Sequence, residues 1–331
     1  MAKKKKKQYS VGLVPLLTLS IALAILLVVF IGGYFNLTPT LKAFSDNVIL
    51  AISTLFEDDG MPHTTTPSAG SNLEVHYIDV GQGDSILIKT PQKNVLIDAG
   101  ENNKGDVVVN YLKKEGIKDL DIVIGTHPHS DHIGGMDIVI DNMNVHTVIM
   151  PELPDSMIPT TRTYEDLLKS IQRKNLKITP AKPYDEYDLG GGARLTILGP
   201  METLKGLNNM SVVSRLDFGE CSFIFTGDME KEAEASLLAN LKNIEILDVD
   251  IYDTPHHGSH SSSTAKFLKA VSPKAAIISC GQGNDYGHPH KETITKLSKL
   301  TDEIHRTDLE GSIIIKCDGK GYTFESEKQK G

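Results

Sequence analysis

Apolar and polar positions divide the sequence into an uncharged N-terminal run, a mainly polar stretch and a long region of alternating strand and helix patterns. No charged residue occurs between Val11 and Leu37, and about 20 apolar residues suffice to cross a bilayer. Residues 38–72 contain a short apolar patch and then many Thr, Ser, Pro and Gly residues, which is typical of a linker. From Leu73 onward the patterns predict one folded domain, residues 73–331.

Within this domain, short β-type runs alternate with helical patterns. The predicted strands are 75–80, 85–90, 94–100, 120–127, 193–200, 251–259 and 275–280, with a hairpin over 211–228 that turns at Gly219. The predicted helices are 106–115, 164–174, 231–241 and 292–300. Several predicted strands end in side chains that can bind metal ions. A fold that gathers strand ends at one edge of a β sandwich, with helices packed outside, would bring these side chains together.

The densest group of ligand-type residues is the segment THPHSDH, residues 126–132, at the end of a predicted strand. His127 and His129 are two positions apart on an extended segment, so their side chains point the same way and can hold one metal ion. Asp131 and His132 enter the following turn and can reach a second ion. An exposed histidine-rich loop is the alternative, which the buried strand leading into the segment disfavours.

This HxHxDH segment resembles the signature of the metallo-β-lactamase superfamily, and Asp98 in LIDAG and Asp228 in FTGD occur in that family's order. The resemblance implies an α/β fold, a four-layer αββα sandwich, with two divalent metal ions. It also implies that Asp228 bridges both ions and that Asp98 orients the ligands through hydrogen bonds. A turn-forming role before Gly100 is the alternative for Asp98, and the two roles can coincide.

A longer series of motifs between Leu73 and Gly321 is similar to the metallohydrolase domain of ComEC-type DNA-uptake competence proteins and their stand-alone relatives. It includes HYIDVGQGDSILI, THPHSDHIGG, HHGSHSSS and ISCGQGNDYGHPH. These relatives include secreted or surface hydrolases of phosphodiesters. The resemblance therefore implies a phosphodiester substrate, either single-stranded DNA or a smaller phosphorylated surface compound. It implies no protein partner.

Two positions depart from the pattern of the β-lactamases in this superfamily. Asn209 occupies the place of a third histidine that completes the first metal site, and Asp228 occupies a place that is commonly cysteine. Carboxylate and amide oxygens favour hard ions, so Mn²⁺ is expected to compete with Zn²⁺. The alternative for Asn209 is a turn residue that opens the next strand. Both departures argue against a β-lactam substrate.

Later histidines are expected to complete the site. We predict that His256 is the last ligand of the second ion and that His257 contacts substrate, although the sequence allows the reverse assignment. His288 and His290 are expected to bind a phosphate oxygen or to protonate the leaving group, with Asp131 as a further catalytic residue. An N-cap or loop role before the predicted helix at 292–300 is the alternative for these two histidines.

The glycine-rich turn at residues 81–85 could be taken for a nucleotide-binding loop. It lacks the Lys-Ser/Thr pair of such loops and lies between two strands, so a hairpin is predicted. Its Asp84 is expected to brace the metal site. The three cysteines, Cys221, Cys280 and Cys317, have no CxxC spacing and are expected to be buried and unpaired.

The distribution of charge predicts how the chain lies in the membrane. Lys3–Lys7 precede the uncharged run, so we expect residues 1–10 to stay in the cytoplasm and residues 11–37 to form an uncleaved transmembrane anchor. The domain would then face outward at the cell membrane. A cleaved signal peptide is the alternative, which the length of the run disfavours. The net charge of −9 includes those lysines, so the rest is too acidic for non-specific DNA binding.

These features predict a membrane-anchored, extracytoplasmic two-metal hydrolase of phosphodiesters. Hydrolysis of a carboxylic ester, lactone or β-lactam is the alternative reaction. A non-catalytic surface receptor or DNA-uptake accessory protein is the alternative from another class. A measurement of bound metal would distinguish the receptor from the enzyme, because a receptor need not retain metal ligands.

Overall fold

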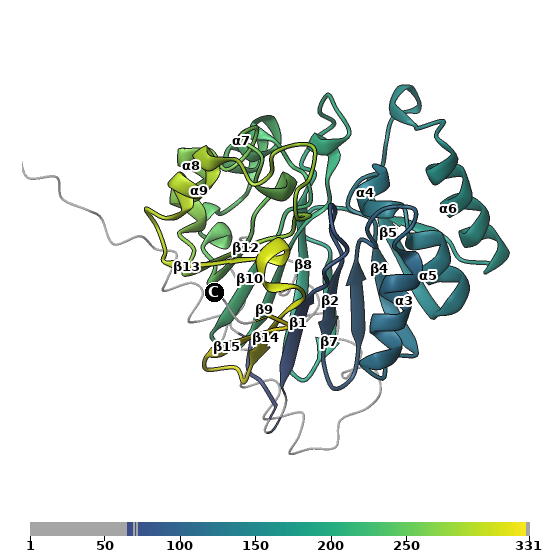
Figure 1. The fold of residues 1–331 in the computed structure, drawn as a ribbon, viewed down its shortest axis with the longest axis horizontal. Coiled ribbons are helices and arrows are strands. Elements are labelled where there is room, and N and C mark those ends of the chain that lie inside the picture. Colours follow the sequence, from purple (N-terminus) through teal and green to yellow (C-terminus); the bar gives the residue numbers. More distant parts are fainter. Residues whose placement is uncertain (1–64, 69, 71, 329–331) are drawn as a thin grey trace, which may run out of the picture. The chain divides into compact units, whose positions relative to one another are not determined.

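The computed structural model describes residues 65–68, 70 and 72–328 of the chain. In this part, two β sheets lie face to face, and helices cover the outer face of each sheet (Figure 1). The arrangement confirms the α/β fold with two sheets that the motifs implied.

The first sheet contains eight strands in the order β15-β14-β1-β2-β3-β4-β5-β6. They are β1 (Leu73–Tyr77), β2 (Ile86–Lys89), β3 (Asn94–Ile97), β4 (Asp119–Ile124), β5 (Asn144–Met150), β6 (Ile178–Pro180), β14 (Ile313–Cys317) and β15 (Tyr322–Ser326). Strands β3 to β6 run parallel, because helices connect them. These helices are α3 (Gly105–Lys114), α4 (Ser130–Ile133), α5 (Met136–Asn142) and α6 (Arg162–Arg173), with the 3-10 helix η1 (Asp155–Met157).

The second sheet contains seven strands in the order β13-β12-β11-β10-β9-β8-β7. They are β7 (Glu186–Gly190), β8 (Ala193–Gly199), β9 (Val213–Phe218), β10 (Cys221–Phe225), β11 (Ile251–Asp253), β12 (Ala275–Ile278) and β13 (Glu303–Arg306). The helices of this half are α7 (Lys231–Asn240), α8 (Ala265–Val271), α9 (Lys291–Leu297) and α10 (Thr307–Glu310). Three short 3-10 helices join them, namely η2 (Asn208–Met210), η3 (Ile244–Leu247) and η4 (His256–Gly258).

The central strands are apolar at nearly every position because both of their faces are covered. In β10, Phe223 and Phe225 pack between the two sheets, whereas Ile224 packs under the helices of the second sheet. In β4, Ile122 packs between the sheets and Val123 packs under the helices of the first sheet. Alternate side chains along a strand therefore build two different apolar layers.

Most of the predicted helices and strands are present, and several of them are shorter than predicted. The helices predicted at 106–115, 164–174 and 231–241 are α3, α6 and α7, and the predicted hairpin is β9–β10 with its turn at Gly219. The turn at 81–85 lies in the connection between the antiparallel strands β1 and β2, as predicted. The predicted strand at 251–259 was too long, because β11 ends at Asp253. The three cysteines are buried and unpaired, as predicted.

The membrane prediction concerns a part of the chain that the structure leaves undescribed. Among the described residues, no helix is both long enough and apolar enough to cross a bilayer. The predicted anchor at residues 11–37 and the basic segment before it lie outside those residues.

Candidate metal centre

Ligand-type side chains that are far apart in the sequence meet at one edge of the sandwich. They follow the carboxyl ends of neighbouring strands: Asp98 follows β3, the segment 127–132 follows β4, Asp228 follows β10 and His257 follows β11. Parallel strands bring such ends together at the same edge of a sheet. A hollow of about 310 Å³ opens there. It is lined by Gln82, His129, Ser130, Asp131, Asn208, Asp228, His256, His257, Tyr286 and His288.

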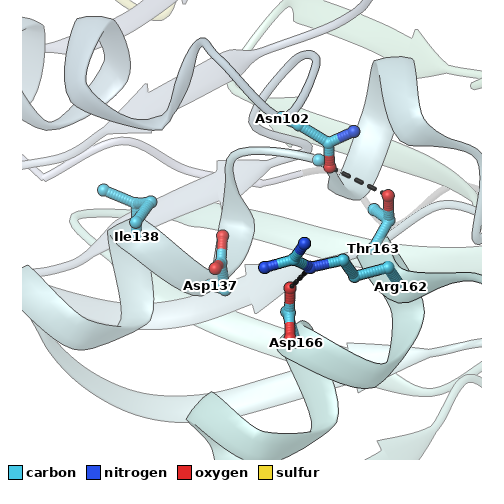
Figure 2. Close-up of a pocket in the computed structure, with 7 residues that line it drawn as sticks. Asn102, Asp137, Ile138, Arg162, Thr163 and Asp166 are labelled. Atoms are coloured by element: carbon cyan, nitrogen blue, oxygen red, sulfur yellow. Dashed lines mark hydrogen bonds and ion pairs between the residues drawn. The ribbon is translucent and has the colours of Figure 1, made fainter.

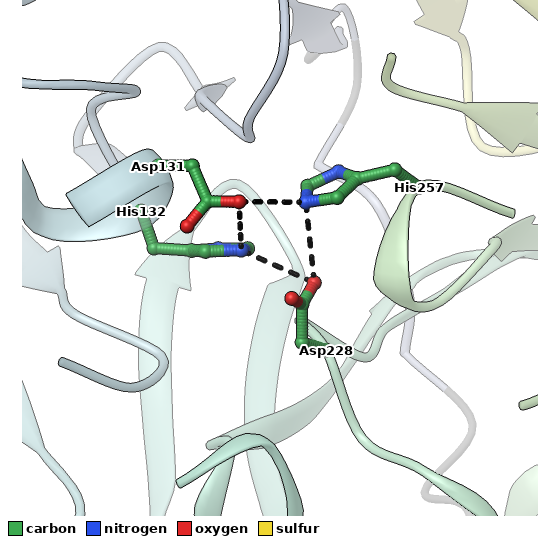
Figure 3. A group of neighbouring side chains, drawn as sticks. All are labelled: Asp131, His132, Asp228 and His257. Carbon is green, nitrogen blue, oxygen red and sulfur yellow. Dashed lines mark hydrogen bonds and ion pairs between the residues drawn. The ribbon is translucent and has the colours of Figure 1, made fainter. Parts of the chain in front are cut away.

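One group of four side chains is shown in Figure 3: Asp131, His132, Asp228 and His257. His257 Nε2 lies 3.2 Å from Asp131 Oδ2 and 3.5 Å from Asp228 Oδ1. His132 Nε2 lies 3.1 Å from the same oxygen of Asp228. One ligand atom of each residue lies within 4.8 Å of those of the others. The group can therefore surround one cation with two imidazoles and two carboxylates.

A second group shares Asp228 with the first. It consists of His127, His129 and Asp228. His127 Nε2 lies 3.0 Å from His129 Nδ1 and 3.8 Å from Asp228 Oδ2. The two carboxylate oxygens of Asp228 thus face different groups, Oδ1 the first and Oδ2 the second.

Two histidines of the first group are held through one ring nitrogen while the other nitrogen faces the centre. His132 Nδ1 donates to Asp98 Oδ2 at 2.8 Å, and His257 Nδ1 donates to the carbonyl oxygen of Ser279 at 3.0 Å. A partner on one nitrogen fixes the ring and leaves the lone pair of the other nitrogen for an ion. Their Nε2 atoms are the ones that converge on Asp228. The residues present therefore fit bound divalent cations.

Asp98 connects both groups from behind. It is fully buried, and its Oδ1 accepts from the Thr126 backbone N–H at 2.8 Å. Its Oδ2 accepts from the Thr126 hydroxyl at 2.6 Å as well as from His132. The Thr126 Oγ1 in turn lies 3.2 Å from His127 Nδ1. Asp98 therefore orients one histidine directly and another through Thr126, and its backbone has a positive φ of 58°.

Asp84 lies behind the same centre. Its Oδ1 is 3.4 Å from His257 Nδ1, and its Oδ2 is 3.7 Å from His132 Nδ1. The turn that carries it is tight, because a Cβ on Gly83 would overlap the backbone carbonyl oxygen of Asp131. The glycine-rich turn therefore packs against the metal-centre segment itself.

The charges of the two groups depend on one another. Burial alone would raise the pKa of Asp228, but the neighbouring His132 and His257 hold that pKa well below its usual range. Burial would likewise lower the pKa of His132, whereas the carboxylates of Asp228, Asp98 and Asp131 raise it well above its usual value. The centre is thus a buried set of carboxylates that requires nearby positive charge, which metal cations supply.

Of the adjacent histidines His256 and His257, whose assignment the sequence left open, the structure places His257 in the first group. His256 Nδ1 instead lies 3.0 Å from Ser261 Oγ, and its Nε2 lies 3.7 Å from Asp228 Oδ2. Both residues have positive φ values of 53° and 55°, which are uncommon for residues other than glycine. This turn after β11 directs the two rings differently.

Asn209, predicted as a metal ligand, is engaged with backbone groups in the structure. Its Nδ2 donates to the carbonyl oxygen of Lys205 at 3.0 Å, and its Oδ1 accepts from the backbone N–H groups of Glu230 and Ala233 at 3.2 Å each. Both ends of the amide are therefore engaged with backbone, and the oxygen satisfies N–H groups at the start of α7.

The neighbouring Asn208, which the sequence patterns did not indicate, lines the hollow instead. Its Oδ1 is buried and has no hydrogen-bond partner in the structure. Gln82 is a second missed residue: its Oε1 accepts from the Gly281 N–H at 3.1 Å, and its buried Nε2 has no partner. Unpaired buried polar atoms are costly, so these two atoms indicate a bound polar group. No residue pattern distinguishes them in the sequence.

His288 and His290 have different positions. His288 lines the hollow, and burial together with the charges of His257 and His256 lowers its pKa to about 4. It is therefore neutral at neutral pH, so it can donate one hydrogen bond but holds no extra proton for a leaving group. His290 lies outside the lining of the hollow, and its Nδ1 accepts from the His260 backbone N–H at 3.1 Å. The proton-donor role of these two histidines stays a prediction.

A second hollow, of about 330 Å³, lies on the helical side of the first sheet and is shown in Figure 2. Its polar groups pair with one another: Arg162 Nε donates to Asp166 Oδ2 at 3.3 Å, and Thr163 Oγ1 donates to Asn102 Oδ1 at 2.9 Å. It contains no histidine or cysteine. The histidines of the two ligand groups lie instead at the hollow at the strand ends.

Comparison with known proteins agrees with this geometry. Residues 78–282 match the family model described as the metallo-beta-lactamase superfamily. The chain is 31% identical over 277 residues to "ComE operon protein 3" of Bacillus subtilis, which covers 78% of this chain and 35% of that protein. It is 29% identical over 240 residues to "Competence protein ComA" of Neisseria gonorrhoeae, covering 71% of this chain and 31% of that protein.

A shorter match, 32% identical over 124 residues, links it to "Ribonuclease Z" of Aeropyrum pernix and covers 34% of this chain and 37% of that protein. The chain spans about a third of the length of each of these relatives. The family model, in contrast, covers more than half of the chain and includes the segment 127–132, Asp228 and His257. Together with the two-sheet fold and the paired ligand groups, this match shows that the chain belongs to the metallo-β-lactamase superfamily.

Proposed function

We propose that this chain is a two-metal hydrolase of phosphodiesters. The observation that carries the proposal is the carboxylate of Asp228, whose two oxygens face two different groups of ligand-type side chains. One residue would then hold both ions. Bound divalent ions would stabilise the negative charge that develops on phosphate oxygens and would favour ionisation of water.

The residues around the ions would bind and orient the substrate. Gln82 Nε2 is a buried donor without a partner, and His288 is a neutral ring on the same hollow. Both can donate to non-bridging phosphate oxygens. Asn208 Oδ1 is a buried acceptor without a partner, so it would bind an ion or a water molecule. Asp131 would act by holding an ion and His257 rather than as a nucleophile.

Two kinds of ligand atom make Zn²⁺ and Mn²⁺ the candidate ions. The four imidazoles of His127, His129, His132 and His257 suit Zn²⁺. The carboxylates of Asp131 and Asp228, with the amide oxygen of Asn208 nearby, suit the harder Mn²⁺. We propose that the two ligand groups bind two divalent ions, and metal analysis of the purified protein would identify them.

The choice of a phosphodiester follows from the site and from the relatives. The hollow contains no nucleophilic cysteine, and two divalent ions held by the ligand groups would neutralise the negative charge of a phosphoryl group. One matching relative is named as a ribonuclease and another as a competence protein, which favours nucleic acid over a β-lactam. Hydrolysis of a carboxylic ester, lactone or β-lactam is the competing reaction.

We also propose that the enzyme acts outside the cytoplasm. The uncharged run from Val11 to Leu37 and the preceding lysines support a single membrane anchor with the domain on the outer side. A substrate at the cell surface, including incoming DNA, would be accessible there.

Metal-dependent turnover tests the proposal. The purified full-length protein, stripped of metal and then supplied with Zn²⁺ or Mn²⁺, would be assayed on bis(p-nitrophenyl) phosphate, a single-stranded oligonucleotide, a phosphorylcholine ester and a chromogenic cephalosporin. We expect about two equivalents of metal and the highest kcat/KM on a phosphodiester. Faster turnover of the cephalosporin would refute the substrate class, and binding of less than one equivalent at saturating supply would favour a non-catalytic receptor.

A further inference from the structure

One large aromatic side chain is exposed at the mouth of the metal centre. Tyr286 is 64% exposed, yet it lines the same hollow as His129, Asp131 and Asp228. An aromatic ring left in water forgoes the stabilisation that burial would give it. Among the residues that line the hollow it is the only Phe or Tyr, and the sequence contains no Trp.

The ring of Tyr286 has a fixed neighbour. It stacks on His288, with ring centroids 5.6 Å apart and an interplanar angle of 19°. His288 in turn lies beside the metal-centre histidines, with its ring centroid 6.1 Å from that of His257. Two nearly parallel rings therefore extend from the ligand groups to the solvent.

The loop that carries both rings is braced by one side chain. Asn284 Oδ1 accepts from the backbone N–H groups of Tyr286 at 3.2 Å and of His288 at 2.9 Å. Its Nδ2 donates to the carbonyl oxygens of Gly281 at 2.8 Å and of His288 at 2.6 Å. A surface that is held in place before binding loses less conformational entropy when a ligand binds.

We propose that Tyr286 and His288 form a stacking platform for a nucleobase that flanks the scissile phosphate, so that the substrate is single-stranded nucleic acid. The inference rests on the proposed phosphodiesterase function, because the phosphate must be held at the metal centre. Exposed aromatic rings stack unpaired bases with little regard to sequence. The bases of a duplex are stacked within the helix and are not available to such a platform.

Two features of the hollow favour a base over a quaternary ammonium group such as choline. Ammonium groups are recognised by cages of several aromatic rings, whereas Tyr286 is the one Phe or Tyr that lines the hollow, and its ring lies nearly parallel to that of His288. No Lys or Arg lines the hollow. The phosphates of a bound strand that lie beyond the metal centre would therefore form no ion pair with the lining of the hollow. Stacking would then supply a large part of the affinity for a strand.

The test compares a deoxyadenosine oligonucleotide with an abasic oligomer of the same length, using the metal-loaded full-length protein. Tyr286→Ala should lower the ratio of kcat/KM for the base-bearing over the abasic substrate about tenfold, mainly through KM. Tyr286→Phe, which keeps the ring, should retain the ratio of the native protein. Leu309→Ala, at an exposed apolar residue outside the hollow, is the matched surface control and should leave the ratio unchanged.

Tyr286→Trp supplies a readout that does not depend on turnover. It introduces the only Trp of the chain, so quenching of its fluorescence by the base-bearing oligomer, and not by the abasic one, would report stacking directly. Equal quenching by both oligomers, or an unchanged kcat/KM ratio in Tyr286→Ala, would overturn the platform. If the native protein hydrolyses neither oligomer nor any other phosphodiester, the proposed function itself fails. Selective loss of phosphorylcholine ester turnover in Tyr286→Ala would replace the base with a choline group.

Discussion

Residues behind the ligand groups orient the imidazoles, and Asp98 contributes most to this orientation. It accepts hydrogen bonds from His132 and from both the backbone and the hydroxyl of Thr126. Both carboxylate oxygens of Asp98 accept hydrogen bonds. An amide side chain in its place would present an N–H₂ group to one of these donors, and that hydrogen bond would be lost. Because Asp98 is fully buried, water cannot replace a lost acceptor at this position.

Asp98→Asn is therefore expected to lower metal affinity and kcat/KM by about 10- to 100-fold, the usual cost of losing a partner behind a metal ligand. The measurement is a metal titration of the stripped protein followed by turnover at saturating metal. Asp302→Asn, at an exposed carboxylate outside the hollow, is the matched control and should behave as the native protein. Unchanged metal affinity in Asp98→Asn would show that the carboxylate only forms a turn.

The adjacent residues Asn208 and Asn209 should separate activity from stability. Asn208→Ala removes an unpaired buried acceptor from the hollow, so we expect lower kcat/KM and little change in unfolding free energy. Asn209→Ala removes the acceptor for two N–H groups at the start of α7, which should cost about 1 kcal/mol or more of unfolding free energy. Chemical denaturation and kinetics on both variants test this, and the reverse pattern would restore Asn209 as the functional residue.

These pairs show where residue-level prediction reaches its limit. Spacing and residue type singled out the HxHxDH segment at the end of a predicted strand, whereas Asp228 was picked out by its place in the order of the family's motifs. The choice between His256 and His257 depended on two positive φ values after β11, and that backbone geometry has no marker in the residues themselves. Asn208 was missed for the same reason, since only the local turn decides which amide faces the hollow.

At the scale of elements, the central strand β10 was predictable from its apolar residues and the edge strand β7 was not. The central strand β10 is buried over almost its whole length. The edge strand β7 has the sequence EYDLG and is mostly half-buried or exposed, so its pattern is that of a polar loop. Edge strands commonly carry charged side chains that prevent pairing with other chains. The same polarity makes them hard to predict from hydrophobic periodicity.

The turn between β1 and β2 couples the fold to the site through Gly83. Its φ is +123°, and a Cβ there would overlap the carbonyl oxygen of Asp131. Gly83→Ala should therefore displace the segment that holds Asp131 and His132, lowering both metal affinity and stability. Gly116→Ala also has a positive φ, of +77°, but nothing within 4 Å of the new Cβ. It should cost only about 1–2 kcal/mol of backbone strain and keep full activity once folded, as metal titration and thermal unfolding would show.

At the scale of the whole molecule, charge separates the chain into a basic N-terminal segment and an acidic remainder. Lys3–Lys7 lie before the uncharged run, and the complete chain still carries a net charge of −9. The domain, which lacks those lysines and is more acidic than the complete chain, gains little from long-range attraction to DNA. Its affinity for a nucleic acid would come from the metal centre and from stacking, and its orientation in a membrane from the lysines.

The last prediction concerns that orientation. Loops rich in Lys stay on the cytoplasmic side of a bilayer, so the lysines should hold the N-terminus inside while the domain after Leu73 faces outward. Protease added to intact protoplasts of a bacterial host should therefore digest the domain while a cytoplasmic marker survives. Replacing Lys3–Lys7 with Gln removes the charge bias and should leave a larger fraction of the domain protected. Complete protection of the native chain until lysis would place the domain in the cytoplasm, and incoming DNA would then no longer be an accessible substrate.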